Sequence, residues 1–386
     1  MQFSFSDVLF SLVLFLLLFI SIFLFTSDKG KHISNILIGS FFLAIFLNLA
    51  DGFLLLKQVY FQYPAAGVWG SNLFLLCGPL IFLYTQSIIY KDFKLSRNKF
   101  IHFLPFGTLF FVSEVGYLAL SNQKQIQFLQ SIIQQRIPLV FYLISGIIYI
   151  HFLAYLILAL RFVNRYEIAA ANHFSEAKKV TLDWLKSIIY FFLVLMGVSA
   201  FNSYLSFRSQ KHAFLFVLSV TIFLLLLFIV FVLFKALRNP EIFSVWEEKE
   251  VEEAVYPTEN AAANPGAIIP DKEKSRLVDK LQQHMQAHKP YLQPDLTLDE
   301  LAGQLSVKPK LLSQSINEIL QQNFFEFINY YRIEEAKRLL TRPKDKKITV
   351  LEVMYEVGFN SKSSFNTLFK KLTGLTPSEF KKNHQD

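Results

Sequence analysis

Apolar residues dominate the first 240 positions of the chain, in stretches that are each about as long as a bilayer is thick. Polar loops separate seven such stretches. A helix needs roughly 20 apolar residues to cross a bilayer core, where backbone polar groups cannot stay unpaired, so we expect each stretch to form a transmembrane helix. The expected helices span residues 5–25, 34–56, 67–90, 100–120, 137–160, 185–207 and 213–237.

The last third of the chain has a different pattern, with apolar positions at helical spacing among charged residues. Every fourth residue from Leu277 to Met285 is apolar, which predicts an amphipathic helix. Thr297 with Glu300 predicts a capping box at the start of a second helix, and Pro309 suits the first turn of a third. The second and third helices share one apolar set, which is typical of a helix-turn-helix unit. Its members are Leu298, Leu301, Ala302, Leu305, Leu312 and Ile316.

This pattern occurs twice. "LTLDELAGQLSVKPKLLSQSI" begins at Leu296, and "ITVLEVMYEVGFNSKSSFNTLF" matches it 52 positions later, or 53 after the turn. Met354 stands in the second copy where Ala302 stands in the first. The intervening "FFEFINYYRIEEAKRLL" (324–340) predicts a long connecting helix. Two units on one helix would present two recognition helices together, and reading successive major grooves requires them about one DNA turn, ~34 Å, apart.

Charge divides the chain into three parts. Residues 1–238 carry a balance of +10, residues 239–270 a balance of −6, and residues 271–386 a balance of +4. The middle part contains prolines, a cluster of Glu and many small residues, so it is interpreted as a flexible acidic linker. In the loops between the expected transmembrane helices and at the ends of those helices, one side carries 13 Lys and Arg and the other 5. Positively charged loops stay in the cytoplasm, so we expect the N-terminus outside and the C-terminal domain inside.

Three stretches carry a family resemblance: "LTLDELAGQLSV", "FINYYRIEEAKRLL" and "EVGFNSKSSFNTLFKKLTGLTPSEFKK". On these motifs, residues 271–383 resemble the DNA-binding domain of AraC/XylS-type transcription regulators. The N-terminal part, with "GPLIFLY" and "HFLPF", looks like that of the membrane-embedded variety. The resemblance implies an all-α protein of the bacterial inner membrane, with a seven-helix bundle (1–238), the linker (239–270) and a cytoplasmic double helix-turn-helix domain (271–386). Met354 departs from the small residue that the family pattern expects in the second unit.

Polar side chains on the two predicted recognition helices are candidates for contact with double-stranded DNA. Amides pair with adenine, hydroxyls with several bases and Lys with guanine or phosphate, and the resemblance implies base-reading positions on the same helix faces. The candidates on the first helix are Lys310, Ser313, Gln314 and Asn317. Those on the second are Lys362, Ser363, Asn366 and Thr367, followed by Lys370 and Lys371 for phosphates. On the connecting helix, Arg332, Glu335 and Arg338 are interpreted mainly as structural ion pairs.

Polar residues inside the expected transmembrane helices are candidates for a ligand site, because they are costly in a bilayer. Asn48 and Asp51 share one face of their helix. Asp51, Glu114 and Asn202 should all lie toward the outer half of the bundle, where the four could line a shared cavity. The alternatives are that they join helices by hydrogen bonds or lie near the membrane interface. His151 lies deeper and is interpreted as structural.

These features predict a one-component regulator whose bundle senses an unknown small-molecule or membrane signal and whose tethered domain binds promoter DNA. A homodimer formed through the bundle or through residues 271–289, or proteolytic release at 239–270, could switch it. A transporter or channel with a DNA-binding regulatory domain is the alternative. The sequence contains no metal-ligand spacing, phosphate loop or nucleophile motif, so we expect neither an enzyme nor a cofactor. The single cysteine, Cys77, lies in an apolar run and is expected to be buried.

Overall fold

The computed structural model describes residues 5–27, 32–90, 93–176, 182–238, 270–341 and 348–384. Most of the predicted linker, residues 239–269, lies outside the described residues. The chain forms two compact units. The first comprises Met1–Val163 and Asp183–Glu247, and the second comprises Asn164–Leu182 and Glu248–Asp386. Residues 164–182, which lie between two expected transmembrane helices, therefore belong to the same unit as the C-terminal domain.

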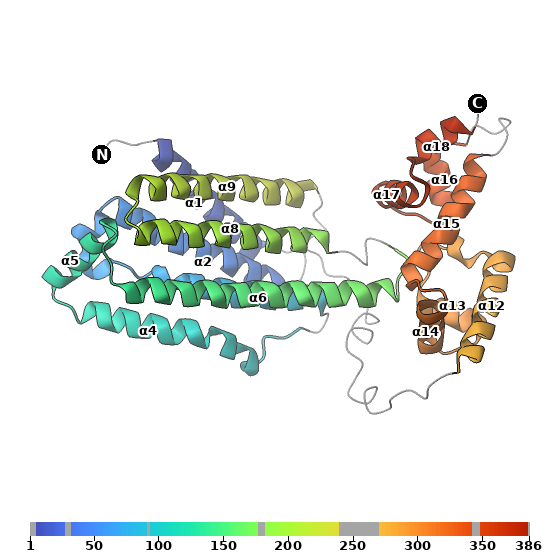
Figure 1. Cartoon of the computed structure of the whole chain (residues 1–386), viewed down its shortest axis with the longest axis horizontal. Coiled ribbons are helices and arrows are strands. Elements are labelled where there is room, and N and C mark those ends of the chain that lie inside the picture. Colours follow the sequence, from blue (N-terminus) through green and yellow to red (C-terminus); the bar gives the residue numbers. More distant parts are fainter. Residues whose placement is uncertain are drawn as a thin grey trace. The chain divides into compact units, whose positions relative to one another are not determined.

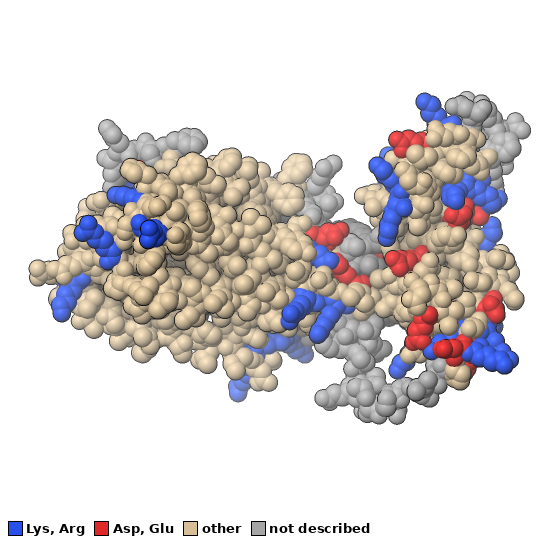
Figure 2. Space-filling view, viewed as in Figure 1, with Lys and Arg blue, Asp and Glu red and all other residues tan. Residues whose placement is uncertain are grey.

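The first unit is a bundle of long apolar helices (Figure 1). Within the described residues, seven helical stretches are long and apolar enough to cross a membrane, as the sequence predicts. The space-filling view shows few charges over the middle of its visible face and Lys or Arg toward its two ends (Figure 2), the distribution that a bilayer favours. The main helices are α1 (Phe5–Thr26), α2 (His32–Leu56), α3 (Phe74–Ile89), α4 (Leu104–Leu118), α6 (Leu139–Ala171), α8 (Asp183–Phe207) and α9 (Lys211–Arg238).

Two local features of the bundle differ from the sequence-based expectation. Pro105 falls inside the expected transmembrane helix 100–120, where a proline would cause a kink. It lies instead in the first turn of α4, after a 3-10 helix over Arg97–Phe103, a position where its missing N–H costs no hydrogen bond. A short amphipathic helix, α5 (Asn122–Ile133), also connects α4 to α6.

Among the described residues, the C-terminal part of the second unit contains seven α-helices, and the described chain contains no strand. This confirms the predicted all-α fold class. The helices are α12 (Asp271–His288), α13 (Leu298–Leu305), α14 (Pro309–Ile319), α15 (Phe324–Leu340), α16 (Val350–Glu356), α17 (Lys362–Thr373) and α18 (Pro377–Asn383).

Helix starts in this unit follow the local sequence. Thr297 and Glu300 form the predicted capping box at α13, and Pro309 lies in the first turn of α14. Equivalent boxes begin α15, α16 and α18. Each box satisfies backbone N–H groups that a helix start leaves unpaired, typically contributing about 1 kcal/mol. Four helix starts are therefore set by side chains within the same turn.

Two apolar cores hold the second unit together. The first contains all six members of the apolar set expected for α13 and α14, together with Leu277, Leu281 and Met285 of α12. The second core joins the end of α15 to α16, α17 and α18. Met354 is 1% exposed in this second core, so the larger side chain is packed where the family pattern expects a small one.

Candidate nucleic-acid interface and bundle cavity

Each apolar core supports one helix-turn-helix unit, α13 with α14 and α16 with α17. In the first turn, Ser306 adopts a left-handed conformation with φ 56°. In the second turn, Gly358 has φ 87°, and a Cβ added there would lie 2.8 Å from the Leu292 carbonyl oxygen. Only glycine fits that backbone and that space. The second turn is therefore built around close contact with the loop that precedes α13.

The candidate DNA-reading residues of α14 lie off its buried face. Leu312 and Ile316 are fully buried in the first core. Lys310 is exposed, whereas Ser313, Gln314 and Asn317 are half-buried. The Asn317 amide lies 3.4 Å from the Ser313 hydroxyl, to which it donates a hydrogen bond. These residues thus form one contiguous polar surface on the helix.

The candidates on α17 are arranged in the same way. Phe365 and Phe369 point into the second core. Lys362, Ser363, Thr367, Lys370 and Lys371 are exposed and Asn366 is half-buried.

Two further polar groups at the helix starts were not singled out in the sequence. Ser361 caps α17, where its hydroxyl accepts from the Ser364 N–H at 3.4 Å. Lys308 precedes α14 as its N-cap residue and is exposed. A helix N-terminus and an adjacent cation are both favourable positions for a phosphate. The Ser that follows "GFN" was the available signal for the first of these.

Of the three charged residues of α15 interpreted as structural ion pairs, Glu335 and Arg338 form one and Arg332 does not among the described residues. Glu335 pairs with Arg338 and with Lys289 at 3.1 Å. The hydrogen bond from Arg338, assisted by Lys289, lowers the pKa of Glu335 to about 2. Arg332 differs, because its guanidinium binds mainly backbone carbonyl groups in a buried position.

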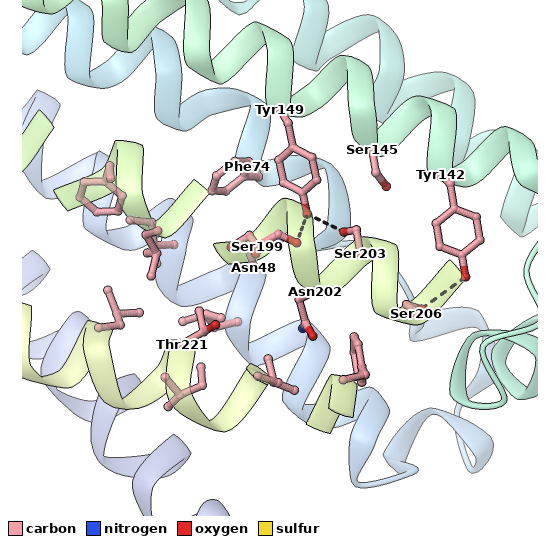
Figure 3. A pocket seen from close by; sticks show the side chains of 18 of the residues that line it. Asn48, Phe74, Tyr142, Ser145, Tyr149, Ser199, Asn202, Ser203, Ser206 and Thr221 are labelled. Atoms are coloured by element: carbon pink, nitrogen blue, oxygen red, sulfur yellow. Dashed lines mark hydrogen bonds between the residues drawn. The ribbon is translucent and has the colours of Figure 1, made fainter. Parts of the chain in front are cut away.

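A cavity of about 340 Å³ lies inside the first unit, between α2, α6, α8 and α9. Figure 3 shows its polar side: the Tyr149 hydroxyl lies 2.9 Å from the Ser203 hydroxyl, and the Tyr142 hydroxyl lies 3.3 Å from that of Ser206. Its remaining polar lining residues are Asn48, Ser145, Ser199, Asn202 and Thr221. Among the described residues that line it, none is charged.

The structure places only two of the four candidate ligand-site residues in this lining. Asn48 and Asn202 line the cavity, and Asp51 and Glu114 do not. The Asp51 carboxylate is buried and accepts a hydrogen bond from the Tyr60 hydroxyl at 2.8 Å. Asn202 is 8% exposed, and its side-chain oxygen has no hydrogen-bond partner. The hydroxyl groups of α6 and α8 were missed in the sequence, because Ser and Tyr are common within apolar helices.

Comparison with known proteins identifies the C-terminal part. A family model described as a helix-turn-helix domain matches residues 301–383. An uncharacterized HTH-type transcriptional regulator of Pseudoalteromonas carrageenovora, from the cgkA 5′ region, is 35% identical over 88 residues, which make up 23% of this chain and 50% of that protein. Another, of Staphylococcus aureus strain COL, is 32% identical over 115 residues, which make up 30% of this chain and 14% of that protein. The chain thus spans half or less of these relatives.

A solved structure is similar to the same part of the chain. It is the C-terminal domain of AraT, a response regulator from Geobacillus stearothermophilus, with 28% identity over 31% of this chain and 91% of that chain and a TM-score of 0.25. The family model and the relatives identify an AraC-type helix-turn-helix domain at the C-terminus of this chain. This confirms the resemblance seen in the sequence for the C-terminal domain, whereas the resemblance of the N-terminal part stays a prediction.

Proposed function

We propose that this protein is a membrane-bound one-component transcription regulator. The observation that carries the proposal is the combination within one chain of seven membrane-length apolar helices and an AraC-type helix-turn-helix domain. The uneven distribution of Lys and Arg in the loops supports a cytoplasmic C-terminal domain. A DNA-reading domain at the inner face of the membrane has direct access to the chromosome.

The two polar helix surfaces on α14 and α17 would read DNA. Gln314, Asn317 and Asn366 suit base edges in the major groove, because an amide can pair with adenine through two hydrogen bonds. Lys370 and Lys371 suit phosphates, which position the protein without reading sequence. The domain's balance of only +4 predicts modest non-specific affinity, so contacts to base edges must supply much of the affinity for a particular site.

The bundle would sense an uncharged ligand in the cavity between α2, α6, α8 and α9. The lining offers hydroxyl and amide groups together with apolar residues such as Phe192 and Leu225. An occupant with a hydrogen-bonding head and an apolar body satisfies both. The unpartnered Asn202 oxygen accepts a hydrogen bond from such a head, and an ionic ligand would find no counter-charge.

Dimerisation through the bundle is the proposed way in which two domains reach one promoter. Residues 271–289 were the other candidate interface. The apolar residues Leu277, Leu281 and Met285 of α12 are buried in the core of their own domain, so this helix has little apolar surface left to offer.

The experiment that tests this function is selection of preferred sequences from random duplex DNA by the full-length chain in detergent micelles. We expect enrichment of a motif in two parts separated by about one helical turn. Chemical crosslinking of the same preparation reports dimers. Recovery of DNA without any enriched motif would contradict sequence-specific regulation.

A further inference from the structure

A short segment between α6 and α8 is built into the second unit. His173, Phe174 and Ser175 follow the end of α6 and run antiparallel to the residues that start α13. The Leu298 N–H donates to the His173 carbonyl oxygen at 3.0 Å, and Phe174 forms an isolated antiparallel bridge with Thr297. The Ser175 hydroxyl donates to the Leu296 carbonyl oxygen at 2.6 Å.

Helix α15 binds the same segment from the other side. The Ser175 carbonyl oxygen accepts from the Asn329 amide at 3.0 Å and from the Arg332 Nη1 at 3.2 Å. The Arg332 Nη2 also reaches the Ser175 hydroxyl oxygen at 3.2 Å. Ser175 is therefore held by backbone on one side and by two α15 side chains on the other.

This contact is buried, as expected of a specific docking site. Phe174 and Ser175 are each 2% exposed, and Arg332 is 1% exposed. Burial lowers the pKa of Arg332 to about 10, which leaves the guanidinium charged at neutral pH and dependent on its hydrogen bonds. Withdrawal of the segment would remove acceptors from a buried charge, which is costly. At the rim, His173 lies 3.2 Å from the Asp299 carboxylate.

The docking site coincides with the junction between the two helix-turn-helix units. Arg332 also donates to the carbonyl groups of Tyr291 and Gln293, each at 2.7 Å. The guanidinium lies 5.6 Å from the ring of Phe359, which lies in the turn of the second helix-turn-helix unit, between α16 and α17. The segment therefore contacts a side chain that lies between the loop before α13 and the turn before α17.

We propose that residues 172–176 are a coupling segment, a built-in peptide ligand of the DNA-binding domain. Docked, it fixes the junction and so holds the two recognition helices in one relative arrangement. Undocked, the junction loses the bonds to Ser175, and the two units no longer bind a two-part site as one body. Since α6 and α8 flank this segment in the chain, a change in the bundle reaches the DNA-binding domain through it. This inference rests on the proposed function.

Crosslinking tests the docking without DNA. The full-length chain receives the pair His173→Cys and Asp299→Cys together with a specific protease site between residues 239 and 269. Cys77 is fully buried and should not react. After treatment with a short thiol crosslinker and protease, we expect the two fragments to stay joined on a denaturing gel for the pair and to separate for either single variant. Separation of the pair, or joining only between two copies, would overturn docking within one chain.

DNA affinity tests the coupling. In the full-length chain, Phe174→Ala should weaken binding to the selected two-part sequence by about tenfold, because one buried aromatic side chain no longer anchors the segment. Binding to a single half of that sequence should not change. Ile168→Ala, an apolar truncation at a 67% exposed position of α6, is the matched control and should bind as the unmodified chain does. Ser175→Ala, a smaller change, should weaken two-part binding in the same direction.

These outcomes separate the inference from the proposed function. If the unmodified chain selects no sequence, the proposed function fails, whatever the crosslinks show. If the unmodified chain selects a sequence, and the Phe174→Ala and Ser175→Ala chains bind that sequence as tightly as the unmodified chain does, the proposed coupling role of residues 172–176 is wrong. The proposed function as a transcription regulator is then unaffected.

Discussion

Arg332 and Ser175 are 157 residues apart in the sequence, and the Arg332 guanidinium donates a hydrogen bond to the Ser175 carbonyl oxygen at 3.2 Å. The same guanidinium binds the carbonyl groups of Tyr291, Gln293 and Pro294. A planar fork with five N–H groups can serve this many acceptors, whereas a lysine ammonium cannot. One buried arginine thus bonds to several backbone carbonyl groups at the junction of the DNA-binding domain.

Replacing Arg332 by Lys should destabilise the second unit by about 2–4 kcal/mol, because several buried carbonyl groups lose a charged donor. Amide hydrogen exchange in the full-length chain measures this loss of stability, because the α15 amides should exchange faster in Arg332→Lys than in the unmodified chain. Arg338→Lys is the control, because Arg338 is half exposed. Weakening its ion pair with Glu335 should lower the free energy of unfolding by less than about 1 kcal/mol. Equal exchange in the two variants would contradict the role of Arg332.

The ion pairs of Glu335 should stabilise α15 in a pH-dependent way. Its pKa is lowered from 4.5 to about 2, so the contribution is fully present above pH 4.5 and is lost as the pH falls toward 2. Glu335→Gln should therefore destabilise the domain at neutral pH by roughly 1 kcal/mol, since both cationic partners are partly exposed. Amide exchange of α15 is compared between the unmodified chain and Glu335→Gln at pH 7 and at pH 3. The difference in stability between the two chains should be smaller at pH 3. A difference in stability that is larger at pH 3 than at pH 7 would contradict the stabilising role of the Glu335 ion pairs.

Gln314→Ala and Lys371→Ala should weaken DNA binding in different ways. The first removes a base contact, so we expect a loss of about 1–3 kcal/mol that is confined to one base pair of the motif. The second removes a phosphate contact, so affinity should fall alike for every sequence and the salt dependence should decrease by about one unit of slope. Binding titrations at several salt concentrations with single-base variants of the site distinguish them. Uniform loss in both variants would show that Gln314 does not read bases.

Asn202 should be dispensable for the stability of the bundle. Its side-chain oxygen is buried without a partner, and replacing an unsatisfied buried amide by an apolar group of similar size is nearly neutral or stabilising. We expect Asn202→Leu to leave the thermal unfolding temperature of the detergent-solubilised chain unchanged or higher. Tyr149→Phe is the control, because it loses the hydrogen bond to Ser203 and should cost about 1 kcal/mol. A clear loss of stability in Asn202→Leu would mean that Asn202 is structural rather than available to a ligand.

Local signals made much of the DNA-binding domain predictable from the sequence. Thr297 with Glu300, and Pro309, lie where capping and proline geometry require them, because these signals act within one helical turn. The seven apolar helices were predictable for a similar reason, since bilayer thickness sets a length that can be counted along the chain. Met354 was identified as a departure from the pattern, and its burial depends on a core that only the folded domain provides.

Long-range pairings were not predictable in this way. Nothing near Ser175 in the sequence indicates that it meets Asn329 and Arg332, because the contact depends on how distant segments fold together. The sequence grouped Asp51 with Asn48, Glu114 and Asn202, and it gave no sign that the Tyr60 hydroxyl binds the Asp51 carboxylate. Helical spacing places residues on a face, and it does not say which neighbouring helix that face meets.

The central claim is that one chain, embedded in the membrane, binds defined DNA sites. Formaldehyde crosslinking of intact cells that express the full-length protein, followed by washing of the membranes and sequencing of the DNA that co-purifies with the chain, tests it most directly. We predict discrete chromosomal sites that share a two-part motif, with the preference at one base pair altered in Gln314→Ala cells. Recovery of the chain from the soluble fraction, or of bulk chromosomal DNA without discrete sites, would contradict the account.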